Sequence, residues 1–319
     1  MLSVRDLCVS FRTEQGEALA IDHVSFDVEE GEILGVVGES GSGKTVSLLA
    51  AMGLINDPNA TISGSIKLRG RELVGMRPSA LRKLRGREMA MIFQDPMTAL
   101  TPVYTIGEQI AEQITTHQKI SKRGALDRAI QLLAEVNIPK PEDAIHRFPH
   151  QLSGGMRQRA VIAMALSNNP SLLIADEPTT ALDCTVQAQI LDLVRRLQRE
   201  HKAAVVFITH AMGVISELAD RVMVMYSGRI VEHATKTEIF RNPQHPYTQA
   251  LLETIPPLTG EKPKRLKVIP GAPPSLFRRP PCCAFAPRCA YRFEPCIKVP
   301  SLEGDRHQAA CFKVHPPHG

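Results

Sequence analysis

The sequence predicts an α/β fold around a largely parallel sheet, and three observations carry this prediction. Short, mostly apolar runs recur along the chain, as is typical of strands covered on both faces, at 32–37, 171–175, 205–209 and 221–226. Apolar residues at helical spacing mark 186–198 as an amphipathic helix. A glycine-rich loop follows the first run and leads into another helical stretch. Strands that alternate with helices in this way build layered α/β domains.

The glycine-rich loop fits the phosphate-binding pattern G-x-x-x-x-G-K-[ST]. Its residues are Gly38, Glu39, Ser40, Gly41, Ser42, Gly43, Lys44 and Thr45. Glycines let the backbone wrap around an anion, and the N–H groups at the start of the following helix point toward phosphate. We expect Lys44 to reach the β- and γ-phosphates and the Thr45 hydroxyl to bind Mg²⁺. A glycine-rich turn with an incidental lysine is the alternative, and the strand–loop–helix context argues against it.

Two acids follow the run 171–175. We expect Asp176 to hold Mg²⁺ through water. Glu177 lies one residue nearer the crevice at the carboxyl ends of the strands, where ligands of such sheets bind, and is the candidate general base for the attacking water. A surface pair of acids at a strand end is the alternative. Together, the loop and the acids predict nucleotide hydrolysis.

A third motif, Leu-Ser-Gly-Gly-Met at 152–156, lies between the loop and the acids and precedes a helix expected at 156–167. A helix start with bare glycines is a ready anion site. The three motifs in this order resemble the nucleotide-binding domain of an ABC transporter. The resemblance implies a P-loop NTPase fold with an antiparallel β edge and an inserted helical subdomain. It also implies that Ser153, Gly154 and Gly155 cap the γ-phosphate bound by an opposing subunit, so that ATP joins two such domains.

The same resemblance assigns roles to further residues. Gln94 matches the glutamine that contacts Mg²⁺ and the attacking water, and His210 matches the switch histidine that grips the γ-phosphate. Asp183 matches the loop that crosses to the partner subunit. Phe11 lies where the family places an aromatic ring against adenine, although it could simply belong to the antiparallel sheet. Ala211 stands where the family usually has aspartate, which removes a polar group beside the switch histidine.

Composition narrows the class of protein. The chain has 319 residues, 43% hydrophobic and 22% charged, which is ordinary for a soluble globular protein. It has no tryptophan and only 4% aromatic residues, so base stacking on nucleic acid is not expected. The net charge of +5 fits work beside anionic lipid or acidic partners, and equally a merely solvated surface. No apolar stretch approaches the ~20 residues of a membrane span, and residues 1–7 lack the apolar core of a signal peptide. We therefore expect a cytosolic chain that docks on separate membrane subunits.

Four longer segments resemble the ATPases of bacterial dipeptide and oligopeptide importers, and in particular their dipeptide-type "D" subunit. These segments are 93–102, 175–183, 245–252 and 269–276. The resemblance implies MgATP hydrolysis that powers uptake of short peptides. It implies two permeases, a second homologous ATPase and an extracellular binding protein as partners, at the cytoplasmic face of the inner membrane. Nickel, glutathione, antimicrobial peptides and some oligosaccharides are alternative substrates within the same subfamily.

Two other classes of function compete with transport. One is a soluble ABC protein that acts on ribosomes or DNA, but such relatives carry two ATPase units in one chain or a long inserted coiled coil, and neither occurs here. The other is a metal-sensing regulatory subunit, which the complete hydrolytic set of residues argues against.

The character of the chain changes after about residue 256. Prolines break any helix there and mark an extended, looping segment. We therefore predict an ATPase domain over 1–256, with its helical subdomain at about 96–158, and a C-terminal extension rich in proline and cysteine over 257–319.

Five of the seven cysteines fall in that extension. Cys283, Cys289, Cys296 and Cys311 match the C-terminal pattern of the family, with gaps of 5, 6 and 14 residues. Disulfides are not expected in a reducing cytosol, so four thiolates suit a [4Fe–4S] cluster or a structural Zn²⁺. The gaps are wider than the usual zinc pairs, which favours the iron–sulfur cluster over zinc or no metal. Cys282 stands where relatives often have glycine and is not expected to be a ligand; Cys8 and Cys184 stand alone and are expected to be packing or surface thiols.

Overall fold

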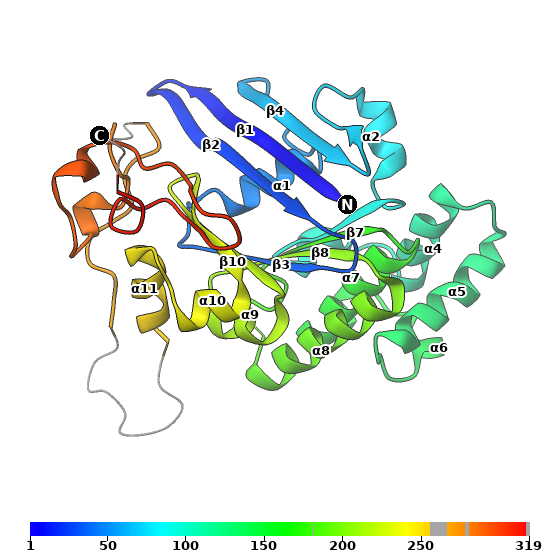
Figure 1. Cartoon of the computed structure of the whole chain (residues 1–319). Coiled ribbons are helices and arrows are strands. Elements are labelled where there is room, and N and C mark those ends of the chain that lie inside the picture. The colour runs from blue at the N-terminus through cyan, green and yellow to red at the C-terminus, as the bar shows by residue number, and fades with distance from the viewer. Residues whose placement is uncertain (181, 256–266, 278–280, 317–319) are drawn as a thin grey trace. The chain divides into compact units, whose positions relative to one another are not determined.

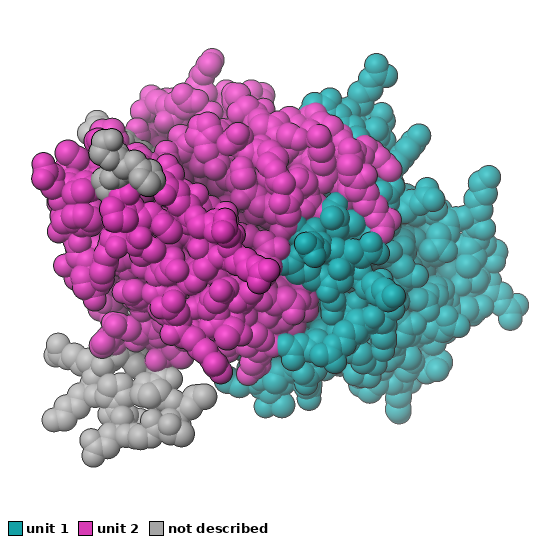
Figure 2. All heavy atoms as spheres, in the orientation of Figure 1, with its two compact units in different colours: residues 1, 28–32, 75–207 teal, residues 2–27, 33–74, 208–319 magenta. Residues whose placement is uncertain are grey.

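The computed structural model describes residues 1–180, 182–255, 267–277 and 281–316. By its internal contacts the chain divides into two compact units, coloured teal and magenta in Figure 2. Unit 1 comprises residues 1, 28–32 and 75–207, and unit 2 comprises residues 2–27, 33–74 and 208–319. The predicted division at 256/257 falls within 256–266, outside the described residues, so that boundary stays a prediction.

Unit 2 contains an antiparallel sheet in the strand order β2-β1-β4-β5. Its strands are β1 (Leu2–Thr13), β2 (Gly16–Val28), β4 (Ala60–Leu68) and β5 (Arg71–Glu72). The long strands β1, β2 and β4 run side by side in Figure 1. Leu2 pairs with Leu68 and Phe11 with Ala60, and the register shifts between Arg5 and Cys8. This sheet is the antiparallel part of the predicted fold.

A second group of strands in unit 2 follows the order β11-β10-β9-β3. Their bounds are β3 (Ile33–Val37), β9 (Arg221–Tyr226), β10 (Arg229–Thr235) and β11 (Gln308–Ala309). β3 pairs with β9 in parallel and is buried throughout, as its continuous apolar sequence predicts. The helices of this unit are α1 (Lys44–Ala51), α9 (Met212–Leu218), α10 (Lys236–Arg241) and α11 (Pro246–Glu253). A Cβ on Gly35 would lie 2.7 Å from Ile215 Cδ1, so glycine lets α9 pack closely on β3.

In unit 1, strand β7 (Leu172–Asp176) lies between β8 (Ala204–Thr209) and β6 (Met89–Ile92). β7 is buried along its whole length and pairs with β6 in parallel. α8 (Cys184–His201) buries the apolar stripe that the sequence predicts, at Ile190, Leu191, Leu193, Val194 and Leu197. The α/β class with a parallel core and an antiparallel sheet is confirmed.

Most of 96–158 is helical, although the helices are short. The helical elements of unit 1, besides α8, are α2 (Pro78–Leu84), α3 (Pro96–Ala99), α4 (Ile106–His117), α5 (Lys122–Glu135), α6 (Pro141–Ala144), the 3₁₀ turn η1 (Pro149–Gln151) and α7 (Gly154–Leu166). α4 begins with a capping box between Thr105 and Glu108, which satisfies N–H groups at its start. α4 and α5 pack on each other and both pack on α7.

The described part of the C-terminal segment has little regular structure. It contains two 3₁₀ turns, η2 (Ala286–Arg288) and η3 (Glu294–Ile297), and the short strand β11. β11 extends the unit 2 sheet, because Gln308 and Ala309 pair with His233 and Glu232 of β10. Among the described residues, none of the helices combines the length and the hydrophobicity that crossing a bilayer requires.

Candidate functional site

The phosphate-binding loop connects β3 to α1, and its glycines have conformations that other residues rarely adopt. φ is +155° at Gly38, +77° at Gly41 and +99° at Gly43. A Cβ on Gly38 would lie 2.2 Å from the carbonyl oxygen of Met225, and one on Gly43 would lie 2.7 Å from Ile21 Cδ1. The loop is therefore folded tightly against β9 and β2, and its shape depends on the absence of side chains.

Lys44 is the first residue of α1 and is only 6% exposed. Its ammonium group donates to the carbonyl oxygens of Gly38 (2.8 Å) and Glu39 (3.0 Å), and it lies 3.4 Å from Ser42 Oγ. The cation is thus held inside the loop at the N-terminus of a helix, where anions are favoured. Ser40, Gly41 and Thr45 remain exposed. This arrangement suits a phosphate ligand.

Glu177 lies beside Gln94 because of the way their strands pair. β6 and β7 run in parallel with Ile92 opposite Ala175, so the residues that follow each strand meet at the same end. Gln94 Nε2 lies 3.3 Å from Glu177 Oε2, and Thr180 Oγ1 donates to the same oxygen at 2.9 Å.

Glu177 has φ +46°, which is unusual for a residue with a side chain. Such strain collects at functional positions. Asp176, one residue earlier, is 6% exposed at the end of β7.

The Leu-Ser-Gly-Gly-Met motif forms the start of α7. The helix begins at Gly154, two residues earlier than expected, because Ser153 is its N-cap and accepts a hydrogen bond from the Met156 N–H at 3.4 Å. Ser153 and Gly154 are exposed. A Cβ on Gly155 would lie 2.8 Å from Val186 Cγ1, so this glycine permits α7 to approach α8.

The other predicted residues fall at the ends of elements. Asp183 is the N-cap of α8, and its carboxylate accepts from the N–H groups of Thr185 (3.0 Å) and Val186 (2.9 Å). His210 is exposed directly after β8. The backbone N–H of Ala211 donates to Thr209 Oγ1 at 3.0 Å, so a hydroxyl on the strand supports this turn. Phe11 is half-buried in β1.

These residues belong to different units, and each set is described within its own. Phe11, His210 and the phosphate loop lie in unit 2, and Gln94, Ser153, Gly154, Gly155, Asp176, Glu177 and Asp183 lie in unit 1.

Four cysteines of the C-terminal segment line one small, mostly apolar cavity in unit 2. They are Cys283, Cys289, Cys296 and Cys311, and Phe285, Tyr291 and Phe293 contribute aromatic walls. Burial raises the pKa of Cys283 to about 11, and the neighbouring Cys296 and Cys311 add to this shift. Burial also raises the pKa of Cys289 and of Cys311, again with contributions from the neighbouring thiols. Cys282 lines a separate, larger cavity of about 590 Å³, which Cys283 also lines.

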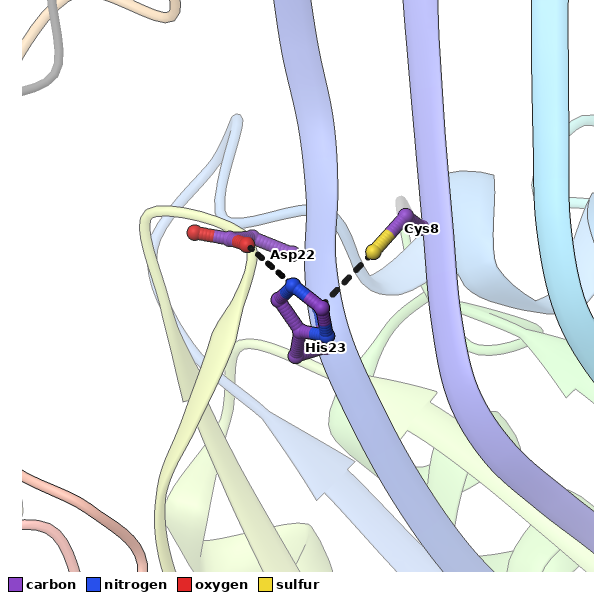
Figure 3. A group of neighbouring side chains, drawn as sticks. All are labelled: Cys8, Asp22 and His23. Atoms are coloured by element: carbon purple, nitrogen blue, oxygen red, sulfur yellow. Dashed lines mark hydrogen bonds and ion pairs between the residues drawn. The ribbon is translucent and has the colours of Figure 1, made fainter.

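Cys8, which we expected to stand alone, lies beside Asp22 and His23 (Figure 3). These three are the only group of three or more potential metal ligands among the described residues whose donor atoms all lie within 4.8 Å of one another. The Asp22 carboxylate already pairs with Arg229, whose Nε and Nη2 each lie 2.7 Å from Oδ2. The group offers only three donors, and one of them already pairs with a guanidinium, so we assign no metal to it.

Sequence reasoning missed the partners of Glu39, the second residue of the phosphate loop. Arg288 of η2 binds its carboxylate with two hydrogen bonds, and the Tyr247 hydroxyl accepts from its backbone N–H at 2.8 Å. The Glu39 hydrogen bonds raise the pKa of Arg288 well above its ordinary value. The arginine lies 249 positions away along the chain, and no local sequence pattern predicts a contact between residues so far apart.

Comparison with known proteins shows which family the chain resembles. The family described as "ABC transporter" matches residues 21–180, and "Oligopeptide/dipeptide transporter, C-terminal region" matches residues 231–296. The oligopeptide transport ATP-binding protein OppD of Bacillus subtilis is 48% identical over 324 residues, which cover 99% of this chain and 89% of that protein. The dipeptide transport ATP-binding protein DppD of Haemophilus influenzae is 48% identical over 314 residues, and this match covers 98% of this chain and 94% of that protein.

Among solved structures, the ATP-binding cassette MJ0796, in a dimeric post-hydrolysis state with ADP and Pi, superposes with a TM-score of 0.67 at 26% identity. The match covers 74% of this chain and 99% of the cassette. With these relatives and the geometry of its phosphate loop and acidic strand, the chain belongs to the ATP-binding proteins of ABC transporters, in the oligopeptide/dipeptide transporter family.

Proposed function

We propose that this chain is the ATP-hydrolysing subunit of a membrane importer for dipeptides and oligopeptides. The observation that carries the proposal is 48% identity across 99% of the chain to a protein named for oligopeptide transport. The second matched family, over 231–296, is itself described by oligopeptide and dipeptide transport, which favours this role over a soluble protein that acts on ribosomes or DNA. Uptake of nickel, glutathione, antimicrobial peptides or oligosaccharides remains the alternative within the same fold.

In the proposed reaction, the phosphate loop holds the triphosphate and Lys44 binds its β- and γ-phosphates. Thr45, Gln94 and Asp176 would hold Mg²⁺, which neutralises charge on the phosphates. Glu177 accepts the proton of the attacking water, and the support for this role is its carboxylate, held by Gln94 and Thr180. His210 grips the γ-phosphate.

The remaining site residues act between subunits in this proposal. Ser153, Gly154 and Gly155 meet the γ-phosphate bound by an opposing ATPase subunit, and Asp183 lies in the loop that crosses to that subunit. Phe11 stacks on adenine. The exposure of Ser153, Gly154 and Asp183 supports an outward-facing role, as does the dimeric state of the cassette MJ0796. ATP binding would join the two subunits, and hydrolysis would release them.

The catalytic assignment is tested by Glu177→Gln. Glutamine keeps an oxygen that can accept from Thr180, so the fold and nucleotide binding should persist, while turnover should fall by about 10²–10⁴, the range that a positioned base supplies. Glu200→Gln removes an exposed acid near the end of α8 and serves as the control. Phosphate release at the unaltered rate by Glu177→Gln would remove Glu177 from its role.

We also propose that Cys283, Cys289, Cys296 and Cys311 hold a [4Fe–4S] cluster, with Zn²⁺ as the alternative. The small apolar cavity that all four cysteines line supports one common site, as do the contributions of neighbouring thiols to the raised pKa values of Cys283, Cys289 and Cys311. No three of these four sulfurs lie within 4.8 Å of one another. Tetrahedral zinc at about 2.3 Å from each sulfur needs separations near 3.8 Å, whereas a cluster binds each thiolate on a different iron and suits wider spacing.

Iron, acid-labile sulfide and zinc on anaerobically purified protein test this assignment, together with the absorption spectrum. Near four irons and four sulfides per chain are expected, and Cys289→Ser should lower both while Cys282→Ser, outside the cavity, should not. One zinc per chain, or no metal in undamaged protein, would reject the cluster.

The proposed assembly is a membrane complex. This chain would pair with a second homologous ATPase and dock on two permease subunits at the cytoplasmic face of the inner membrane, served by an extracellular binding protein. The names of the relatives, which are ATP-binding proteins of peptide transport or import, support this arrangement. Co-purification of the chain with membrane-embedded permeases tests it.

A further inference from the structure

Arg288 joins the cysteine cavity to the phosphate loop. It ends η2 and immediately precedes Cys289, yet its side chain is only 4% exposed. Nη1 and Nη2 reach Glu39 Oε2 (2.6 Å) and Oε1 (2.9 Å), which is the bidentate geometry of a strong guanidinium–carboxylate pair. Nε donates to Pro270 O at 2.8 Å and Nη2 to Ile269 O at 3.2 Å. The guanidinium is thus fixed on several sides.

Glu39 contacts both Arg288 and the nucleotide-binding Lys44. Its side chain is bound by Arg288, its N–H donates to the Tyr247 hydroxyl, and its carbonyl oxygen accepts from Lys44 Nζ at 3.0 Å. A continuous chain of hydrogen bonds therefore runs from Arg288 through one residue of the loop to Lys44. Cys289 is covalently adjacent to its first member.

An aromatic cluster holds the cysteine segment against this part of unit 2. Phe285, 3% exposed, packs edge-on against Tyr226 with 5.4 Å between ring centroids, and its ring lies 5.3 Å from that of Tyr247. Tyr226 also accepts a hydrogen bond from Arg288 Nη1 at 3.3 Å. The same residues that anchor the cysteine segment therefore support Arg288 and Glu39.

The charges explain why this contact matters for an anionic ligand. The Glu39 carboxylate lies in the loop that is to receive a triphosphate, and it is 27% exposed. Without a partner, its negative charge would oppose the ligand. Arg288 neutralises that charge and fixes the carboxylate on the side of the C-terminal segment. Lysine could replace the charge but not the two-pronged geometry.

We propose that Arg288 is a positioning residue of the phosphate loop, through which the state of the cysteine segment sets the affinity for nucleotide. A segment with its cysteines bound in one site holds Arg288 on Glu39 and keeps the loop ready for phosphate. Disruption of that site releases Arg288 and weakens nucleotide binding. This inference rests on the proposed role of the loop in binding MgATP.

The test is a double-mutant cycle on the full-length chain, read as the Kd for AMP-PNP with Mg²⁺. Arg288→Ala should raise the Kd by about tenfold, within the usual range of coupling between sites, and Arg288→Lys by less. In a Glu39→Gln background the same Arg288→Ala change should alter the Kd less than about twofold, because the contact that it removes no longer carries charge. Arg292→Ala, an exposed arginine in the same segment, is the control and should change nothing.

A second double-mutant cycle, between Cys289 and Glu39, tests whether the cysteines affect nucleotide binding through Glu39. Cys289→Ser should weaken AMP-PNP binding when Glu39 is present and should have little effect in the Glu39→Gln background. Thermal unfolding of each variant separates loss of fold from loss of coupling. Equal effects of Arg288→Ala or Cys289→Ser in both backgrounds, or no effect in either, would overturn the inference.

Lys44→Ala distinguishes this inference from the proposed function. If Lys44→Ala abolishes binding while Arg288→Ala binds normally, the loop is the nucleotide site and the inference alone is wrong. If Lys44→Ala binds normally, the proposed site itself is wrong, and a Kd that Arg288→Ala leaves unchanged would then reject the inference as well.

Discussion

Gly38 and Gly41 form a matched pair that tests the shape of the phosphate loop. Both have positive φ, at +155° and +77°, but their surroundings differ. A Cβ on Gly38 would lie 2.2 Å from Met225 O and 2.8 Å from Ser42 Oγ, whereas a Cβ on Gly41 would meet nothing within 4 Å. Alanine at the two positions therefore imposes backbone strain in both cases and a steric clash only at Gly38.

The magnitudes follow from these two terms. An L-residue in left-handed backbone costs about 1–2 kcal/mol, so Gly41→Ala should destabilise the loop by about 1 kcal/mol. Gly38→Ala adds an overlap with a backbone oxygen of β9, and because β9 pairs with β3, that oxygen cannot move away alone. Overpacking of this kind costs about 1–3 kcal/mol, which brings the total for Gly38→Ala to about 3 kcal/mol.

Equilibrium binding of AMP-PNP with Mg²⁺ is the assay, alongside denaturant unfolding. If the strain is relieved by distorting the loop, Gly41→Ala should weaken binding by about fivefold and Gly38→Ala by about a hundredfold, at 1.4 kcal/mol per tenfold. Comparable affinities for the two variants would refute the reasoning, because the surroundings of the two glycines would then not govern binding.

Three further predictions concern stability. Phe285→Ala should destabilise the C-terminal segment by about 3–5 kcal/mol, since the ring is buried, whereas Phe277→Ala, at 40% exposure, should cost less than about 0.5 kcal/mol in denaturant unfolding. Burial, and then Arg221, lowers the pKa of His233 from 6.5 to about 4, so the unfolded chain takes up its proton first as the pH falls. The contribution of His233 to the free energy of unfolding should therefore be level above pH 6.5 and decline toward pH 4 by up to about 3 kcal/mol, and a His233→Gln variant that keeps the full slope would contradict this. Asp183→Ala should lower the free energy of unfolding by about 1 kcal/mol, because it removes the N-cap of α8, while Asp183→Asn should keep most of the stability that the cap provides. Equal losses of stability for the two variants would argue against the cap.

The parallel core and the site motifs could be predicted because their signals are local. A buried strand reads as a short apolar run, and the phosphate loop, Asp176 and Glu177 follow such runs directly. The meeting of Gln94 with Glu177 follows as well, once β6 and β7 are parallel and in register. The sequence predicts the start of α7 two residues too late, because the low helix propensity of Gly154 and Gly155 hides a helix start that the Ser153 N-cap stabilises.

The contacts that the sequence could not predict join distant segments. Arg288 and Glu39 are 249 positions apart, and the packing of Phe285 on Tyr226 and Tyr247 depends on how the C-terminal segment folds back. The left-handed backbone of Glu177 is likewise invisible in sequence, because glutamate has no preference for that conformation. The grouping of Cys8 with Asp22 and His23 arises from the strands β1 and β2 lying side by side.

Uptake of a labelled dipeptide or oligopeptide into sealed vesicles tests the central claim most directly. The vesicles would contain the permeases and the second ATPase together with this chain, with the binding protein on the opposite face. The account predicts uptake that requires MgATP on the side of this chain and that Lys44→Ala abolishes. Peptide uptake that persists without MgATP or with Lys44→Ala would contradict it, as would transport of nickel or glutathione in place of peptide.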